Sequence, residues 1–390
     1  MCEGNYVING LAALQILAAL ECEIITGNLS FELLRDLTDL AGLETLRRVD
    51  GDVNFRYATG LTSLEGLHNL ESVGGFLRFD QQHDLADLSA LRSLEVVEGT
   101  LALIINLSIV SLSIPNLREV GALSITNNGG LERLDLPSLR RARSVSIVGG
   151  YLTDISSLSQ LEELRNLSVE QTRELALPKL SHLTLLDNLL LYDQAIKSLE
   201  GLETITQVDN LTLSGTGLVN VDGLDNLAYV GGNLTIQDND TLSSLSAFSK
   251  VQTITGKLGI DRNASLTSLS GMEGLENVND LTVTENPITS LVGLSGVRRV
   301  AGSVLFQKNH SLTSFAGFDN VLYVAGNFSV SLHDSLTTLS PLEAWPSNAM
   351  EGEFWVQFSP NLPECEADAV AAHFGQDCSR CQGNTGTGGC

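Results

Sequence analysis

Apolar residues along the chain follow neither the two-residue period of a strand nor the 3.6-residue period of a helix. Between Gly232 and Val304, three successive segments share one pattern. Each opens with an apolar-x-apolar triplet and has an Asn five residues after the first apolar position. The triplets begin at Leu234, Leu258 and Leu281, and the Asn residues are Asn239, Asn263 and Asn286. A fixed period in the twenties built on short strands predicts a solenoid.

The same starting position can be followed along the rest of the chain. The first inward apolar residues lie 22 to 26 residues apart and mark fifteen coils. They are Leu29, Val53, Leu77, Leu101, Leu123, Val145, Leu167, Leu189, Leu211, Leu234, Leu258, Leu281, Val304, Phe328 and Phe354. We therefore predict a mainly β protein in which about fifteen coils stack on one elongated core.

The two ends depart from this pattern and predict caps. In residues 1–27, Leu11, Leu14 and Leu17 have helical spacing after Asn9 and Gly10. A helix there would cover the first coil, whose unpaired backbone would otherwise invite aggregation. Residues 359–390 form a cysteine-rich cap and tail with a short helix expected over Ala367–Phe374. We expect three aromatic residues to close the last coil: Trp345, Trp355 and Phe358.

Between the caps we predict one continuous solenoid over residues 28–358. The middle coils are shorter, and several lack the Asn. No linker rich in Pro, Gly or Ser interrupts them. The alternative is two abutting sub-domains that meet near Ser144–Gly150.

Six cysteines lie only near the ends: Cys2, Cys22, Cys365, Cys378, Cys381 and Cys390. An even number confined to the caps predicts disulfide bonds and an oxidising compartment. A Cys2–Cys22 bond would close a loop of about 20 residues, worth about 3 kcal/mol in the chain-entropy account. The last four cysteines allow three pairings, of which we favour Cys365–Cys378 with Cys381–Cys390. We interpret the CxxC sequence at Cys378 as structural.

The chain has 47 acidic and 22 basic residues, for a formal net charge of -25. This balance argues against a nucleic-acid backbone or an anionic membrane as the main partner. It either serves solubility or steers a cationic partner. The longest apolar run, Leu11 to Leu20, is about half the length that spans a bilayer. No signal peptide is visible at Met1, which we expect to mark the start of a mature chain.

Several segments resemble the receptor L domain, the repeat domain of insulin-receptor and epidermal-growth-factor-receptor ectodomains. The opening residues 2–31 read CEGNYVINGLAALQILAALECEIITGNLSF, with a Cys, a short helix, a second Cys and then I-x-G-x-L-x-F. The segments LTSLEGLHNLESVGGFLRF (Leu61 to Phe79) and LTSLSGMEGLENV are similar to later turns of that family. The resemblance covers nearly the whole chain and is closest in character to secreted microbial L-domain proteins.

This resemblance implies a right-handed, three-sided β-solenoid and a binding role, without naming a ligand. The cysteine-rich modules and the kinase of the receptors are missing from the sequence, which speaks against receptor signalling. Candidate ligand residues are five apolar side chains predicted to point outward: Phe76, Ile104, Val148, Leu190 and Tyr192. Exposed apolar groups on one sheet can mark a partner surface. The alternative is that another segment covers them.

The sequence predicts no catalytic residue and no cofactor. A polysaccharide-cleaving solenoid needs two carboxylates about 5 to 10 Å apart. The acids beside the main strand lie several coils apart: Glu32, Asp80, Glu170 and Asp261. The sequence contains no GxSxG motif and no Walker loop.

We also predict no metal site. His310 and His333 lie at similar corner positions in neighbouring coils, either as two solvated side chains or as metal ligands. Asp238, Asn239 and Asp240 could suggest calcium ligation, but they lack the nonapeptide repeat and the EF-hand spacing. We interpret them as an Asx turn.

The recurring Asn239, Asn263, Asn286 and Asn309 are expected to form a ladder that satisfies backbone groups at the corners. Some lie in N-x-S/T sequons, as do Asn106, Asn166, Asn210, Asn233 and Asn327. We interpret the sequons as a by-product of the repeat, although a eukaryotic secretory pathway would glycosylate some of them.

These features predict a non-enzymatic recognition or adhesion protein, secreted or at the cell surface. It would bind an extracellular protein or glycan across one face of the solenoid. The alternatives are a carbohydrate-active β-helix enzyme and a surface-structural or ice-binding solenoid. The ligand and the oligomeric state stay open.

Overall fold

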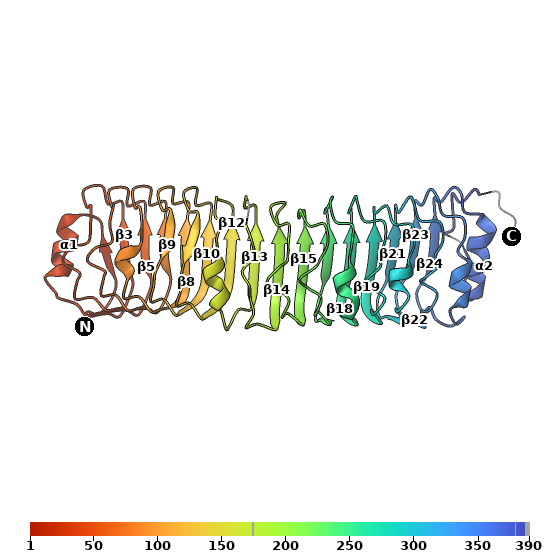
Figure 1. The fold of residues 1–390 in the computed structure, drawn as a ribbon, viewed down its shortest axis with the longest axis horizontal. Helices are drawn as coiled ribbons and strands as arrows, with labels where there is room; N and C mark the ends of the chain where they lie inside the picture. Colours follow the sequence, from red (N-terminus) through yellow and green to blue (C-terminus); the bar gives the residue numbers. More distant parts are fainter. Residues whose placement is uncertain (174, 379, 387–390) are drawn as a thin grey trace. The chain divides into compact units, whose positions relative to one another are not determined.

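The computed structural model describes residues 1–173, 175–378 and 380–386. Two units, residues 1–183 and 184–390, are each held together by their own contacts and are described separately. Within each unit, successive turns of the chain add parallel strands side by side (Figure 1). This confirms the predicted β-solenoid architecture. The prediction of one continuous solenoid over residues 28–358 stays a prediction.

The described part of the first unit contains seven main strands, one in each predicted coil. They are β3 (Leu29–Glu32), β5 (Val53–Arg56), β7 (Leu77–Asp80), β8 (Val96–Ile104), β10 (Glu119–Thr126), β12 (Arg141–Val148) and β13 (Asn166–Glu170). The shorter strands are β1 (Tyr6–Ile8), β2 (Ile24–Ile25), β4 (Arg48–Val49), β6 (Ser72–Val73), β9 (Ser111–Ser113) and β11 (Arg133–Asp135). β12 pairs with β10 on one side and β13 on the other, so the alternative junction near Ser144–Gly150 falls inside this unit.

The second unit repeats the arrangement with eight main strands among its described residues. They are β14 (Leu185–Tyr192), β15 (Gln207–Ser214), β17 (Leu234–Gln237), β18 (Thr253–Asp261), β19 (Asn277–Thr284), β21 (Val304–Gln307), β23 (Phe328–Ser331) and β24 (Phe354–Gln357). Short strands β16 (Tyr229–Val230), β20 (Arg299–Val300) and β22 (Tyr323–Val324) accompany them.

The predicted coil starts set the register of both sheets. In the first unit they pair from Leu29 with Val53 up to Val145 with Leu167. In the second they pair from Leu189 with Leu211 up to Phe328 with Phe354. All fifteen are buried. Burying each such side chain is worth about 1.5 to 3 kcal/mol, so a slip of one residue would expose an entire row.

The remaining part of a coil is irregular or forms a short 3-10 helix. These helices are η1 (Ser89–Leu91), η2 (Ser156–Gln160), η3 (Ser246–Lys250), η4 (Val292–Leu294) and η5 (Ser340–Ala344). Their backbones pass close to the neighbouring coil. A Cβ atom on Gly293 would overlap the carbonyl oxygen of Leu269, so only glycine fits there.

The N-terminal cap is helix α1 (Leu11–Ala18), as predicted, with Gly10 at its N-cap. Leu14 and Leu17, on the inner side of the helix, are buried. The Cys2–Cys22 disulfide joins the segments before and after the helix. The C-terminal cap contains α2 (Glu364–His373). It begins three residues before the predicted helix, directly after Pro363, and its first turn carries Glu364 and Glu366. Carboxylates stabilise a helix at this end.

The C-terminal disulfides differ from the favoured pairing. Cys378 bonds to Cys381, so neither Cys365–Cys378 nor Cys381–Cys390 forms. A tight turn brings the two Cα atoms to 5.1 Å, within the range that a disulfide spans, and the Cys381 N–H donates to the Cys378 carbonyl. Cys365 is also disulfide-bonded, whereas Cys390 lies outside the described residues.

The predicted aromatic closure is only partly correct. Trp345 is buried, packs edge-on against Phe318 and Phe328, and donates its indole N–H to the Phe318 carbonyl at 2.8 Å. Trp355 instead lies at an outward position of β24, and Phe358 is 52 % exposed just after that strand. Among the described residues, no helix is long and apolar enough to cross a membrane.

Candidate binding surface

Most main strands end in a tight turn made by two residues with different roles. We call the first the corner residue. It adopts a left-handed backbone conformation, as at Ile105 (φ 54) and Arg262 (φ 50), and its side chain is at the surface. We call the next one the ladder residue; its side chain is buried, as in Asn106 and Asn263. The turn thus places one side chain outside and the next inside.

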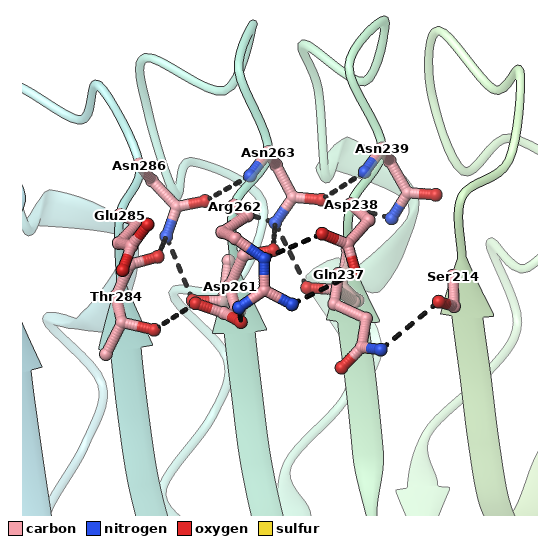
Figure 2. Close-up of polar contacts among 12 residues, drawn as sticks. Ser214, Gln237, Asp238, Asn239, Asp261, Arg262, Asn263, Thr284, Glu285 and Asn286 are labelled. Atoms are coloured by element: carbon pink, nitrogen blue, oxygen red, sulfur yellow. Dashed lines mark hydrogen bonds and ion pairs between the residues drawn. The ribbon is translucent and has the colours of Figure 1, made fainter.

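Ladder residues of the second unit form a chain of hydrogen bonds (Figure 2). The Asn263 carbonyl Oδ1 accepts from the Asn239 backbone N–H at 3.2 Å and from the Asn239 Nδ2 at 3.0 Å. Asn263 in turn donates its backbone N–H to Asn286 Oδ1 at 3.0 Å. The Asn263 Nδ2 donates to the Ile236 carbonyl in the preceding coil at 3.0 Å.

This arrangement continues from Thr216 through Asn309. It satisfies main-chain donors and acceptors that the turn leaves without partners in the interior, where an unpaired group is costly. The predicted Asn ladder is therefore confirmed. In the first unit a shorter ladder joins Gln82, Asn106 and Asn128. The sequon residues Asn106, Asn263 and Asn309 are thus buried and use their side-chain amides within the fold.

His333 occupies a ladder position and corrects the expectation of a solvated side chain. It is fully buried, and its Nδ1 lies 3.0 Å from the Asn309 carbonyl. Its Nε2 is buried without a hydrogen-bond partner among the described residues. Burial lowers the pKa of His333, outweighing the opposing effects of the Asn309 and Phe306 backbone carbonyls, which favour the protonated ring. His310 instead pairs through Nδ1 with Asp334 at 2.8 Å at the surface.

Four consecutive corner residues of the second unit alternate in charge: Asp238, Arg262, Glu285 and Lys308. Arg262 contacts the Asp238 carboxylate through two nitrogens at 2.7 and 3.1 Å, and it also pairs with Asp261 (Figure 2). One coil further, Lys308 pairs with Glu285 at 2.9 Å. The hydrogen bond with Asp238 raises the pKa of Arg262, and the one with Lys308 lowers the pKa of Glu285.

These pairs bear on the calcium alternative for Asp238, Asn239 and Asp240. The Asp238 carboxylate is engaged by Arg262, and the Asn239 side chain is directed into the ladder. In the part of the chain that the structure describes, no group of three or more His, Cys, Asp or Glu could hold a metal ion.

Three corner residues of the first unit are apolar, whereas Gln81, Asn127 and Gln171 at other corners are polar. Leu33, Tyr57 and Ile105 are 62 %, 44 % and 38 % exposed, and all three have positive φ. Backbone bonds from Leu33 to Arg56, from Tyr57 to Asp80 and from Gln81 to Ile104 place them in consecutive coils. The Gln81 amide also donates to the Tyr57 hydroxyl at 3.2 Å. We name Leu33, Tyr57, Gln81 and Ile105 the corner column.

This column combines exposed apolar area with an unfavourable backbone. The left-handed region costs an L-residue roughly 1 to 2 kcal/mol, and a β-branched residue such as Ile105 is a clear outlier there. Asn or Gly would fit at lower cost. The structure therefore holds an apolar side chain at a position where the fold itself favours a different residue.

The predicted ligand residues belong to both units, and the three in the first unit do not adjoin one another. Phe76 is 51 % exposed just before β7. Ile104 and Val148 are half-buried at the ends of β8 and β12, and Thr126 of β10 lies between them in register. Leu190 and Tyr192 belong to β14 in the second unit, half-buried and 38 % exposed. Only Ile104 adjoins the corner column.

Sequence reasoning missed Tyr57 and Ile105, as well as the exposed Leu107 and Val110. The strand pattern marks outward residues by alternation, and the left-handed turn ends that alternation. The available signal was position, because each corner residue directly precedes the recurring inward residue.

The acidic residues beside the main strands remain separate. Asp80 is buried and pairs with Arg78 at 2.8 Å. Asp261 contacts Arg262 and the Thr284 hydroxyl. Asp80 lies two coils from Glu32, as the register of β3, β5 and β7 shows. These contacts give the acids structural partners.

An open cleft of about 800 Å³ lies beside the C-terminal cap. The Arg380 guanidinium sits 4.6 Å from the centre of the Trp355 ring, and Glu353 accepts the Trp355 indole N–H at 2.9 Å. Glu351 and Asp377 add two further carboxylates to the lining. The cleft is a polar hollow with one aromatic wall.

The model of the receptor L domain family matches residues 21–151 and 228–314, together more than half of the chain. Among curated proteins, none matches this sequence. A leucine-rich-repeat protein of Leptospira interrogans has a similar solved structure, with 16% identity, a TM-score of 0.40, and coverage of 93% of this chain and 91% of that one. The crystal structure of the TLR13–ssRNA13 complex is a second similar structure, with 16% identity and a TM-score of 0.34. The match covers 87% of this chain and 58% of the TLR13 chain.

Proposed function

We propose that this chain, which belongs to the receptor L domain family, is a non-enzymatic extracellular recognition or adhesion protein that binds a protein or glycan. Membership of this family supports a ligand-binding role, because receptor L domains are binding scaffolds. The disulfides at both caps support an oxidising, extracellular setting.

The observation that carries the proposal is the corner column of the first unit. Leu33 and Tyr57 are exposed in adjacent coils, Gln81 lies in the coil between Tyr57 and Ile105, and Ile104 extends the apolar surface toward the sheet. Contiguous exposed apolar area marks a partner surface.

The test replaces Tyr57 and Ile105 by Asn. Asn tolerates the left-handed backbone, so the double variant should fold at least as well as the parent. An array of glycans and recombinant extracellular proteins identifies a ligand for the full chain. We expect the double variant to lose at least about tenfold in affinity, because a few central residues dominate most interfaces.

Leu332→Asn is the matched control, because Leu332 has the same backbone conformation (φ 61) in the second unit. It should leave the affinity unchanged. Unchanged binding by the Tyr57 and Ile105 variant would remove this column as the binding surface. Substituting Leu190 and Tyr192 by Asp then tests the outward residues of β14 in the same assay.

A further inference from the structure

We propose that the outer face of helix α1 is a second docking surface, which binds an apolar polypeptide face, such as an amphipathic helix, with a basic rim. The inference goes beyond the corner column and does not depend on it. It starts from a requirement of solenoids, whose terminal caps need a polar outer face for solubility.

Helix α1 is apolar on both sides. Its inner side buries Leu14 and Leu17 against the first coil, and Ala18 packs against Gly42 of that coil. At 3.6 residues per turn, the residues that face away occupy about half of the circumference. They are Leu11, Ala12, Gln15 and Ile16 in the helix, with Ala19 and Leu20 in the turn that follows it, and all six are exposed. Gln15 is the single polar residue among them.

The exposure is large for apolar side chains. Leu11, Ile16 and Leu20 are 53 %, 67 % and 50 % exposed, and the nearby Val7 is 54 % exposed. Ala12 and Ala19 lie between them and would let a partner's backbone approach closely. The outer face therefore has the composition of the buried side of a helix that packs on both sides.

The other cap shows what a solvated outer face looks like in the same protein. Helix α2 buries Ala367, Val370 and Ala371. Its exposed residues are Glu364, Cys365, Asp368, Ala369 and Ala372. Every residue of α2 is described, and none is a large exposed apolar side chain. The C-terminal cap meets the requirement that α1 does not.

The charged residues near α1 indicate the charge of the partner that would bind there. Glu3, Glu21 and Glu23 are all exposed at the two ends of the cap segment. Residues 1–45 contain seven acidic residues and one basic side chain, Arg35. In the following coil, Arg47 and Arg48 are paired with Glu71 and Asp50. Exposed carboxylates at both ends of an apolar face are complementary to a partner with Lys or Arg beside its apolar stripe.

The same charges argue against two other occupants. A second copy of the chain would bring the same carboxylates together, and α2 would present Glu364 and Asp368. An anionic membrane would meet carboxylates of its own sign. The partner chemistry that remains is an apolar, basic polypeptide.

The experiment uses the full chain and a fluorescein-labelled, fourteen-residue helical peptide of Leu and Lys with one Leu face. Fluorescence anisotropy reports the affinity. We expect Ile16→Ser with Leu20→Ser to weaken binding at least about tenfold, because the central apolar contacts dominate such interfaces. Both residues face away from the first coil, so the thermal melt should not change. A peptide with Glu in place of Lys should not bind.

Two controls separate the surface from the overall acidity of the chain. Val292→Ser with Leu322→Ser removes equally exposed apolar residues elsewhere (50 % and 57 % exposed) and should leave the affinity within about twofold. Glu3→Gln, Glu21→Gln and Glu23→Gln together should weaken binding and reduce its dependence on salt. Ile105→Asn should have no effect, which keeps this test independent of the corner column.

Three outcomes would overturn the proposal. Equal affinity of the parent and the Ile16/Leu20 variant for the peptide would mean that the overall negative charge of the chain, and not the outer face of α1, binds it. A dimer in sedimentation that the same variant abolishes would identify a second copy as the occupant. Binding of the parent, but not the variant, to phosphatidylcholine vesicles would identify a lipid surface instead.

Discussion

One row of corner residues in each unit shows how the same turn can carry different surface chemistry. In the second unit, corner residues Asp238, Arg262, Glu285 and Lys308 form ion pairs above a long Asn ladder. In the first unit, corner residues Leu33, Tyr57 and Ile105 are exposed and apolar, and the ladder is short. The backbone at the corner is left-handed in both.

This difference teaches that different physical constraints act on the inward and the outward residue of the turn. The ladder residue supplies hydrogen bonds that the backbone requires, and its identity is restricted. The corner residue above it contacts solvent, so its identity can vary between charged and apolar. Surface chemistry can therefore change along the solenoid without a change in fold.

The largest expected effect comes from breaking the ladder. Asn263→Leu keeps the number and branching of side-chain heavy atoms but removes the partners of the Asn239 N–H and of the Ile236 carbonyl. We expect a loss of about 3 to 5 kcal/mol in the free energy of unfolding, because several buried groups lose their partners. Urea denaturation measures it. Asn226→Leu, at an exposed Asn, is the control and should cost less than about 1 kcal/mol. An equal loss for both variants would contradict the separation of roles.

The next effect concerns His333, where the ladder of the second unit contains a titratable ring. Burial lowers its pKa in the folded state, so the unfolded chain binds the proton first as the pH falls. The contribution to stability is complete above about pH 6.5, the unfolded pKa, and is lost below it, as the pH falls toward the folded pKa. The slope reaches at most about 1.4 kcal/mol per pH unit.

His333→Asn should remove this part of the pH dependence and supply an amide to the ladder. The polar groups around His333 are the Asn309 and Phe306 carbonyls, the Ser359 hydroxyl that accepts the His333 backbone N–H, and the His310–Asp334 pair at the surface. Thermal melts between pH 5 and 8 compare the parent, His333→Asn and the exposed control His182→Asn. Parallel pH profiles for the parent and His333→Asn would show that the ring does not titrate on unfolding.

A smaller effect is expected at the corner of the first unit. Ile105→Asn should stabilise the protein by about 1 kcal/mol, because Asn tolerates the left-handed conformation better than a β-branched residue. In a unit of this size that corresponds to a rise of about 2 to 4 °C in Tm. Differential scanning calorimetry measures it, with Ser124→Asn on a regular strand as the control. A destabilised Ile105→Asn would show that the side chain supports the fold.

The smallest effect is expected for the surface ion pairs of the second unit. Arg262→Ala removes contacts with Asp238 and Asp261, yet exposed pairs contribute only about 0 to 1 kcal/mol. The difference from the parent should shrink in 1 M NaCl, because salt screens exposed charges. Urea denaturation at low and high salt provides the comparison. A loss as large as that of Asn263→Leu would contradict the assignment of stability to the ladder.

Much of the fold could be predicted because the same residue types recur at the same positions in successive coils of a solenoid. One residue type at one position, such as Leu258 or Leu281, fixes both the strand and its register. The ladder was predictable for the same reason, since Asn263 and Asn286 recur with the period. The N-terminal helix was predictable from its spacing.

The features that escaped prediction lie where the repeat is interrupted. His333 was expected in solvent because its residue type is polar, whereas its position directs it inward. Trp355 and Phe358 are aromatic, but their positions direct them outward. The Cys378–Cys381 bond depends on a local turn that spacing alone did not distinguish from two other pairings. Position in the coil proved the better guide than residue type.

The in-register stacking also limits how such a chain can change length. Removing the 23 residues from Leu258 to Asp280 would bring Leu281 to the place of Leu258 and Asn286 to that of Asn263. Removing one or two residues within a strand would place the wrong side chains against the strands on either side, whereas the segments between strands already differ in length, since the coil starts lie 22 to 26 residues apart. Loss or gain of a whole coil therefore preserves the register of every strand, and each added coil brings one more corner residue to the surface.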